Sequence, residues 1–345
     1  MKPVAFIFGA ALLAAFVGPS ARAQSGACDR ACLEGFVDRY LDALAKHDPS
    51  AVPLSAGVRF TENGQRLGIG DALWRSMKSK GTYRLFVSDV DAGQVAFIGT
   101  VNEENSDPAQ VTPALIGLRL RIVGNQITEI EQAVVRNVDA AKRVEALGRP
   151  NLRFLETIPE NQRMSRAELI RTANMYFSGM QKNDGKGVYP FADDCDRLEN
   201  GTQTTNRPTP AGEKRPDPVT ATNYSAQWSC LEQFKSGLLH FVTRIRDRRF
   251  VAVDQERGLV LAFGFFDHSA GDTRNFVAPN GRHVTAGPAQ PWTWYLAEMF
   301  KIEDGKIHRI EAILDRVPYG MLSGWSSWED GMSDRAQDVT RSPAH

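Results

Sequence analysis

The sequence has no excess of charge of either sign. Lysine and arginine together number 41, and aspartate and glutamate also number 41. A protein that binds nucleic acid or an anionic membrane surface through its overall charge carries a clear basic excess. The balance therefore argues against both kinds of partner and favours a small, largely neutral ligand.

Beyond its first residues the sequence also lacks long apolar runs. No later segment approaches the roughly 18 residues of a membrane-spanning helix, so we expect no membrane span. At the start, Lys2 precedes an apolar stretch at 4–17, and Ala21-Arg22-Ala23 follows it. This pattern is typical of a secretory signal peptide cleaved after Ala23. We therefore expect residues 1–23 to be removed and the mature protein to be soluble, in the periplasm or secreted.

The motifs of several large enzyme classes are missing. The sequence has no G-x-S-x-G elbow, no P-loop and no dinucleotide fingerprint after a strand, which disfavours serine hydrolases and enzymes that use nucleotides or nicotinamide. His283 and His308 lack metal-ligand spacing to another histidine or cysteine. We therefore expect no cofactor and no metal.

Cysteine is scarce, with four residues at positions 28, 32, 195 and 230. An even number in an exported chain predicts disulfides, and four cysteines allow three connectivities. We favour Cys195 with Cys230, because this bridge restrains a long loop rich in proline and threonine. Cys28 and Cys32 lie four apart on an expected helix, where a bridge is feasible but strained. A zinc site is the alternative interpretation.

An internal repeat indicates two domains, for which the chain is long enough at about 100 to 200 residues each. Each half opens with apolar residues at helical spacing, which predicts one helix before Lys46-His47-Asp48 and another before Lys182-Asn183-Asp184. A short helical or looped stretch then ends in Glu-Asn-Gly, at 62–64 and at 199–201. The apolar helix positions are Leu33, Phe36, Val37, Tyr40, Leu41 and Leu44 in one half and Leu169, Ala173, Tyr176, Phe177 and Met180 in the other.

Both halves then continue as strands. Hairpins are predicted at 87–103 and 251–268, and strand pairs turned through glycine at 118–136 and 292–316. Each unit is expected to be α+β, with a curved antiparallel sheet wrapped around its long N-terminal helix. The predicted order is a first domain at 24–139, a linker at 140–164, a second domain at 165–330 and a polar, mobile tail at 331–345.

The repeated unit resembles the SnoaL-like branch of the nuclear-transport-factor-2-like cone fold, here in tandem. The second half also resembles an uncharacterised family of exported bacterial and fungal proteins, through the runs at 243–250 and 264–268. This resemblance implies two cone-shaped α+β barrels, each with an opening where related enzymes place acids, bases and aromatic side chains. The fold also hosts binding modules and structural domains, so it does not fix the function.

The pair Asp267-His268 ends a strongly apolar strand, whereas the first half has Asn102-Glu103 at the matching position. An imidazole exchanges a proton near neutral pH, and a carboxylate can orient it. Adjacent strand residues point to opposite faces, so we expect either Asp267 or His268 to face a pocket as a general base. A solvated strand end is the alternative.

Further catalytic candidates lie nearby in the sequence. His240 could complete the site, and Arg246 or Arg316 could stabilise a developing oxyanion. Arg316 is favoured because it follows the more apolar face of the last strand. The alternative for the arginines at 244–249 is an ion-pair lattice with carboxylates such as Glu311 and Asp315.

Aromatic residues concentrate in the second half, which holds five of the six tryptophans. Bulky rings with a polar edge suit a site for a flat organic ligand, although they can equally fill a core or an interface. The candidate substrate-binding residues are Trp228, Trp292, Trp294, Tyr176, Tyr295 and Tyr319.

Resemblance to SnoaL-like enzymes implies a cofactor-independent lyase or isomerase that acts on an aromatic or polycyclic small molecule. Proton abstraction would lead to isomerisation, dehydration or carbon–carbon cleavage. The first domain would act as a structural partner that buries a sheet edge or face. The alternatives are a non-catalytic periplasmic binding protein for a hydrophobic compound, and a scaffold whose sheets form a homodimer.

Overall fold

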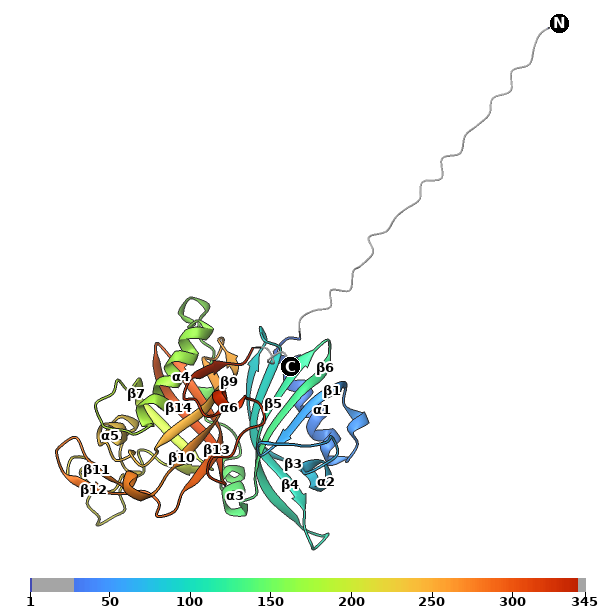
Figure 1. Ribbon diagram of the computed structural model, residues 1–345. Coiled ribbons are helices and arrows are strands. Elements are labelled where there is room, and N and C mark those ends of the chain that lie inside the picture. The colour runs from blue at the N-terminus through green and yellow to red at the C-terminus, as the bar shows by residue number, and fades with distance from the viewer. Residues whose placement is uncertain (2–27, 341–345) are drawn as a thin grey trace.

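The computed structural model describes residue 1 and residues 28–340 (Figure 1). The predicted signal peptide at 1–23 therefore lies, except for Met1, outside the described residues. Two sheets form two domains of mixed helix and strand, as the repeat predicts, and both sheets are open. No helix in the described part of the chain is long and apolar enough to cross a membrane.

The first domain is a six-stranded sheet with one long helix, α1, on one face. The predicted helix positions are buried on α1, and Asp29 caps its first turn by accepting a hydrogen bond from the Cys32 backbone. The strand order is β2-β1-β6-β5-β4-β3. The elements are α1 (Arg30–Ala45), β1 (Leu54–Glu62), β2 (Gln65–Arg66), α2 (Leu73–Ser76), β3 (Met77–Asp89), β4 (Gln94–Glu104), β5 (Val111–Val123) and β6 (Gln126–Val135).

The second domain repeats this plan around helix α4. Ser165 and Glu168 form a reciprocal capping box at its start. The sheet order is β15-β9-β10-β13-β14-β7-β8, and a small hairpin, β11 with β12, stands apart. The elements are α4 (Arg166–Met180), β7 (Phe191–Glu199), β8 (Thr202–Gln203), α5 (Cys230–Lys235), β9 (Arg244–Asp254), β10 (Leu259–His268), β11 (Asn275–Val277), β12 (His283–Thr285), β13 (Trp292–Glu303), β14 (Lys306–Val317), α6 (Trp328–Gly331) and β15 (Ala336–Asp338).

The sheets are mixed and not purely antiparallel, which corrects the sequence prediction. The stretch before each Glu-Asn-Gly is a strand, β1 or β7, and not a helix or loop. It pairs in parallel with the last long strand of its own domain, β6 or β14. Hydrogen bonding to a strand far along the chain supplies the order that the local sequence does not encode.

The two sheets pack against each other through the faces that carry no long helix (Figure 1). Arg249 makes a two-pronged ion pair with Glu131 at 2.6 and 2.7 Å, and Tyr295 donates to the same carboxylate at 2.8 Å. In the opposite direction, Tyr83 of the first domain donates to Glu311 at 2.7 Å. The first domain therefore covers much of one face of the second sheet, and the sequence analysis predicts that it buries a sheet edge or face.

Glycine at position 117 permits this close approach of the sheets. A Cβ atom placed on Gly117 would lie 2.7 Å from the Cβ of Ala297 and 2.8 Å from a side-chain carbon of Ile313. Any larger residue would push the two sheets apart.

The predicted linker contains a helix, α3 (Val138–Leu147), and short helical turns at Leu152–Phe154 and Glu160–Gln162. Buried α3 and Phe154 side chains belong to the hydrophobic cluster between the sheets. The prediction of a mobile tail from Gly331 is wrong for its described part, because residues 336–338 pair with β9 as strand β15. Backbone hydrogen bonds to β9 hold this polar segment in place, although residues 336–338 bury no apolar side chain.

Two disulfides are present, Cys195–Cys230 and Cys28–Cys32. The first confirms the favoured pairing and ties strand β7 to helix α5. The second shows that the close pair near the start of α1 is also bridged, so the zinc interpretation is excluded for these cysteines. No three His, Cys, Asp or Glu side chains within residues 28–340 are grouped to hold a metal ion.

Candidate active site

The alternation of side chains along β10 decides which residues reach the helix side of the second sheet. Phe266 and His268 lie on the helix-side face, whereas Phe265 and Asp267 lie on the face toward the first domain. Asp267 accepts from Arg246 at 2.9 and 3.2 Å, from Arg244 at 2.8 Å and from Thr293 at 2.6 Å. This fully buried carboxylate is saturated.

Asp267 and Arg246 therefore form a structural ion pair, and the prediction that they serve a pocket is wrong. The alternative interpretation, an arginine lattice, is confirmed. Its partner carboxylates are Asp267, Asp247 and Glu131 in place of the expected Glu311 and Asp315. Sequence proximity could not reveal Glu131, which comes from the other domain.

His268 is fully buried among aromatic rings at one end of the helix-side face. It stacks on Trp292 with ring centres 4.0 Å apart and meets Trp294 edge-on at 5.0 Å. Its Nδ1 donates to the Phe266 carbonyl at 3.1 Å, which leaves Nε2 as an acceptor with no partner in residues 28–340. Burial, which is the main cause, lowers the pKa of His268 to about 4. It is a neutral imidazole at physiological pH.

The other predicted catalytic residues lie at the periphery. Arg316 is exposed and covers the outer face of Trp292, with 5.1 Å from its guanidinium carbon to the ring centre. His240 stacks on Phe276 and contacts the carbonyl of Asn183. Neither lines the internal cavity of the second domain.

Of the predicted aromatic wall, only Trp294 lines that cavity. Tyr295 points to the interdomain face, where it binds Glu131. Trp228 is buried in a separate cluster and donates to the carbonyl of Pro216. Tyr319 is exposed and bonds to Ser269. The placements of Tyr295, Trp228 and Tyr319 correct the predicted wall.

A cavity of about 40 Å³ lies between α4, the sheet and the loops that precede β9. Its apolar wall includes Met180, Phe266, Trp294, Leu296 and Leu314, and three charged residues, Arg197, Glu199 and Glu298, open into it. A volume of this size holds a few water molecules. The cavity is therefore an apolar chamber with a single charged corner.

Glu298 is the residue that sequence reasoning missed. It sits on β13 in the helix-side row Trp294, Leu296, Glu298 and Phe300, and only 2 % of its surface is exposed. Burial raises the pKa of its carboxyl to about 8, with Glu199 adding to the rise. Its Oε2 atom has no hydrogen-bond partner in the described chain. Glu298 is thus protonated and uncharged at pH 7, and its Oε2 is free to hydrogen bond with a bound molecule.

Arg197 and Tyr176 complete the charged corner. Arg197 is buried, pairs with Glu199 at 3.0 Å, and donates to Gln233 at 2.6 Å and to the Tyr176 hydroxyl at 3.3 Å. Tyr176 in turn hydrogen bonds with Glu298. Tyr176, predicted as a substrate contact, therefore links the arginine to the buried acid and does not line the cavity.

Loop residues close the cavity on the side away from the sheet. Tyr224, from the long proline-rich loop, and Phe241, from the segment before β9, both line it, with ring centres 6.4 Å apart. Phe241 also stacks on His268 at 5.9 Å between ring centres. His268 is thus one layer behind the cavity wall.

Comparison with known families shows the family to which the chain belongs. A family model described as a domain of unknown function, DUF8021, matches residues 27–134 and 162–314. The chain belongs to this family. One matched region covers most of the first sheet and the other covers most of the second sheet. No curated protein matches the chain.

Two solved structures are similar to part of the chain. AclR, a proposed hydroxylase from Streptomyces galilaeus, is 13% identical, with a TM-score of 0.26 over 39% of this chain and 92% of AclR. A de novo designed protein with a curved β-sheet is 16% identical, with a TM-score of 0.23 over 44% of this chain and 88% of the design. TM-scores this low support no argument about the function of the DUF8021 protein.

Proposed function

We propose that the second half of this DUF8021 protein is a cofactor-independent lyase or isomerase that uses Glu298 for proton transfer to or from a small, largely apolar organic molecule. The observation that carries this proposal is the uncommitted Oε2 of a buried acid in a chamber whose wall is apolar except for the charged corner of Glu298, Arg197 and Glu199. A carboxyl whose pKa lies near the working pH is suited to general acid–base chemistry.

The neighbours of Glu298 support proton exchange in both directions. When Glu298 gives its proton to a substrate oxygen or carbon, the new carboxylate is stabilised by the nearby Arg197 charge and by Tyr176. In an isomerisation the carboxylate then takes a proton from another substrate carbon. In a dehydration the proton leaves with the departing hydroxyl as water, and the Glu298 carboxylate takes the proton from the neighbouring carbon as the double bond forms. No redox partner is needed in either case.

The closed cavity restricts what can bind without movement. About 40 Å³ is far smaller than the 300 Å³ or more of a typical small-molecule site. An aromatic or polycyclic ligand, the class that the SnoaL-like resemblance implies, requires displacement of Tyr224 and Phe241. Trp294 and Phe266 would then supply the flat apolar walls.

We further propose that each half is a cone-type unit of the SnoaL-like kind. The long helix on one face of an open sheet, present in both halves, supports this assignment. In this arrangement the first half is the structural partner and the second half holds the chamber.

Native mass spectrometry of the protein from its own host identifies a retained small molecule, whose conversion is then measured with wild type and Glu298→Gln. We expect the variant to bind the molecule and to convert it about 100-fold more slowly, the low end of acid–base effects. The control is Glu213→Gln, at an exposed loop position. A ligand that is retained but never converted identifies a periplasmic binding protein, and equal turnover in Glu298→Gln overturns the proposed role.

A further inference from the structure

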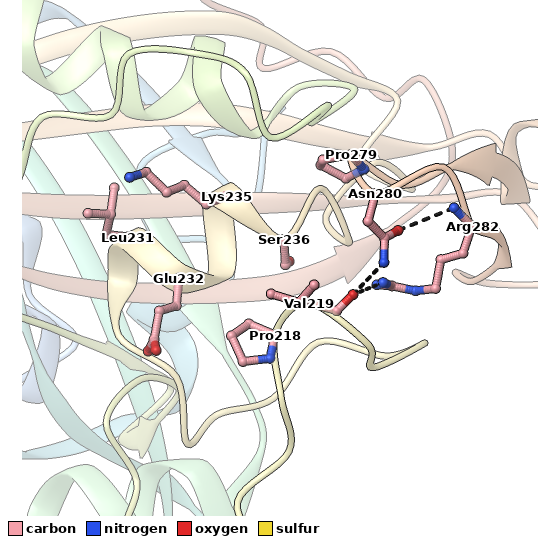
Figure 2. Close-up of a pocket in the computed structure, with 9 residues that line it drawn as sticks. All are labelled: Pro218, Val219, Leu231, Glu232, Lys235, Ser236, Pro279, Asn280 and Arg282. Carbon is pink, nitrogen blue, oxygen red and sulfur yellow. Dashed lines mark hydrogen bonds between the residues drawn. The ribbon is translucent and has the colours of Figure 1, made fainter.

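A second, larger cleft lies outside the chamber, between helix α5 and two loops of the second domain (Figure 2). Its volume is about 340 Å³, within the range of small-molecule sites. Pro218 and Val219 of the proline-rich loop form one wall, and Leu231 of α5 and Pro279 form others. The cleft shares no lining residue with the chamber of Glu298.

The walls of this cleft are held in place by specific contacts. Arg282 donates to the carbonyls of Val219 and Ala221, and Asn280 donates to the carbonyl of Val219 at 2.6 Å (Figure 2). On the other side, the Cys195–Cys230 disulfide fixes the first residue of α5. The cleft is therefore built before a ligand arrives, which reduces the entropy cost of binding.

The side chains around the cleft carry more positive than negative charge. Within residues 28–340, no carboxylate pairs with Lys235, and the guanidinium of Arg282 meets only carbonyl oxygens. The acidic residue on the rim, Glu232, is already bound by Arg215. Lys235 extends along the Leu231 side of the cleft, opposite Arg282 (Figure 2). An anionic group on the Leu231 side of the rim would thus meet the Lys235 ammonium, which no carboxylate of the described residues binds, while the nearby Glu232 is held by Arg215.

We propose that this cleft binds an amphipathic carboxylate of small size, such as a medium-chain fatty acid anion. The apolar tail would lie against Pro218, Val219, Leu231 and Pro279, and the carboxylate would meet Lys235 at the rim. The apolar lining supplies the affinity for the tail, and the unpaired cation selects the anion over a neutral analogue. This site is independent of the proton-transfer function proposed for Glu298.

The proposal is tested by isothermal titration calorimetry with decanoate and with 1-decanol on the full mature chain. We expect decanoate to bind saturably with one site per chain, and 1-decanol to bind at least tenfold more weakly. Lys235→Glu should weaken decanoate binding at least tenfold. The matched control, Lys214→Glu, makes the same charge change at an exposed position of the loop between β8 and α5 and should leave the affinity unchanged.

A blocking variant locates the site. Val219 is 60% exposed, so Val219→Trp should fold, as circular dichroism checks, and its indole should fill the cleft and abolish binding. Glu298→Gln should bind decanoate as wild type does, which separates this site from the chamber. Absence of saturable binding, equal affinity for 1-decanol, an equal loss in Lys214→Glu, or binding that depends on Glu298 would each overturn the proposal. If Val219→Trp does not fold, the two lysine variants decide the question.

Discussion

Leu118 and Glu298 occupy equivalent positions in the two sheets. Leu118 pairs with Gln132 across strands β5 and β6, and Glu298 pairs with Ala312 across β13 and β14, at the same place relative to the turn that follows. Both side chains are buried on the helix-side face. The first repeat therefore has an apolar residue where the second has an ionisable acid. At this position the first half has a packed core, and the second half has the chamber.

The first half pairs its buried side-chain oxygens around the same position. Tyr40, the counterpart of Tyr176, donates to Gln132 at 2.8 Å, and Gln132 donates to Glu62 at 2.9 Å. Glu62 is also bound by Arg136. The network has no open oxygen comparable to Oε2 of Glu298, so any chemistry is expected in the second half.

Glu298→Gln is expected to change how the free energy of unfolding depends on pH. The pKa of Glu298 is about 8 in the folded protein, against an ordinary value of 4.5. Its neutral form stabilises the fold below pH 4.5, and this contribution is lost as the pH rises through 8. Relative to wild type, the glutamine variant should gain up to about 1.4 kcal/mol per pH unit across this window.

Urea denaturation of both proteins from pH 5 to pH 9 measures this difference. Glu213→Gln serves as the exposed control and should follow wild type. Parallel pH profiles for wild type and Glu298→Gln would show that the carboxyl is ionised in the folded protein.

The buried imidazole of His268 should make the protein sensitive to acid. Its pKa is depressed to about 4 from 6.5, so its stabilising contribution is present above pH 6.5 and is lost as the pH falls through 4. His268→Phe retains a ring between Trp292 and Phe241 and cannot take up a proton. As the pH is lowered from 6.5 to 4, the melting temperature of wild type should therefore fall relative to that of His268→Phe. The control His283→Phe, at an exposed position, should show no such trend.

Asp267→Asn is expected to act mainly on the stability of the fold and much less on the rate of any reaction. The substitution leaves the fully buried Arg246 without its carboxylate, and breaking a buried ion pair in this way costs about 3 to 5 kcal/mol. Thermal unfolding followed by circular dichroism measures the loss. Asp272→Asn, at an exposed position, is the matched control. A melting temperature equal to that of wild type would contradict the structural role.

Removal of the Cys195–Cys230 bridge should destabilise the protein by about 2 to 4 kcal/mol, because the bridge closes a long loop. The double variant Cys195→Ser, Cys230→Ser tests this by chemical denaturation. The Cys28–Cys32 bridge spans only four positions, so the corresponding double variant should lose less. A larger loss for the short bridge would contradict this ranking.

Much of the fold could be predicted from the internal repeat. Apolar spacing located α1 and α4, and the glycine turns located the last strand pair of each half. The parallel pairing of β1 with β6 could not be predicted, because it depends on where the chain returns after the helix and not on local pattern. The ordered β15 was missed for the same reason.

The candidate site was predicted less well, because the acid beside His268 at the end of the strand is a structural ion-pair partner and the acid in the chamber lies on another strand. The useful signal was a lone carboxylate, Glu298, in a row of every second residue that is otherwise large and apolar. The same alternation places Tyr295 on the opposite face from Trp294. Partners such as Glu131 for Arg249 arise from domain packing, which no local pattern encodes.

Strand β15 has a consequence for how this protein behaves at high concentration. It covers the outer side of β9, an eleven-residue strand that would otherwise present open backbone N–H and C=O groups. Uncovered strand edges of this kind recruit other chains and start aggregation. At the opposite end of the sheet, β8 is only two residues long. Loss of the segment at 336–338 would therefore expose part of the β9 edge and allow it to pair with other chains.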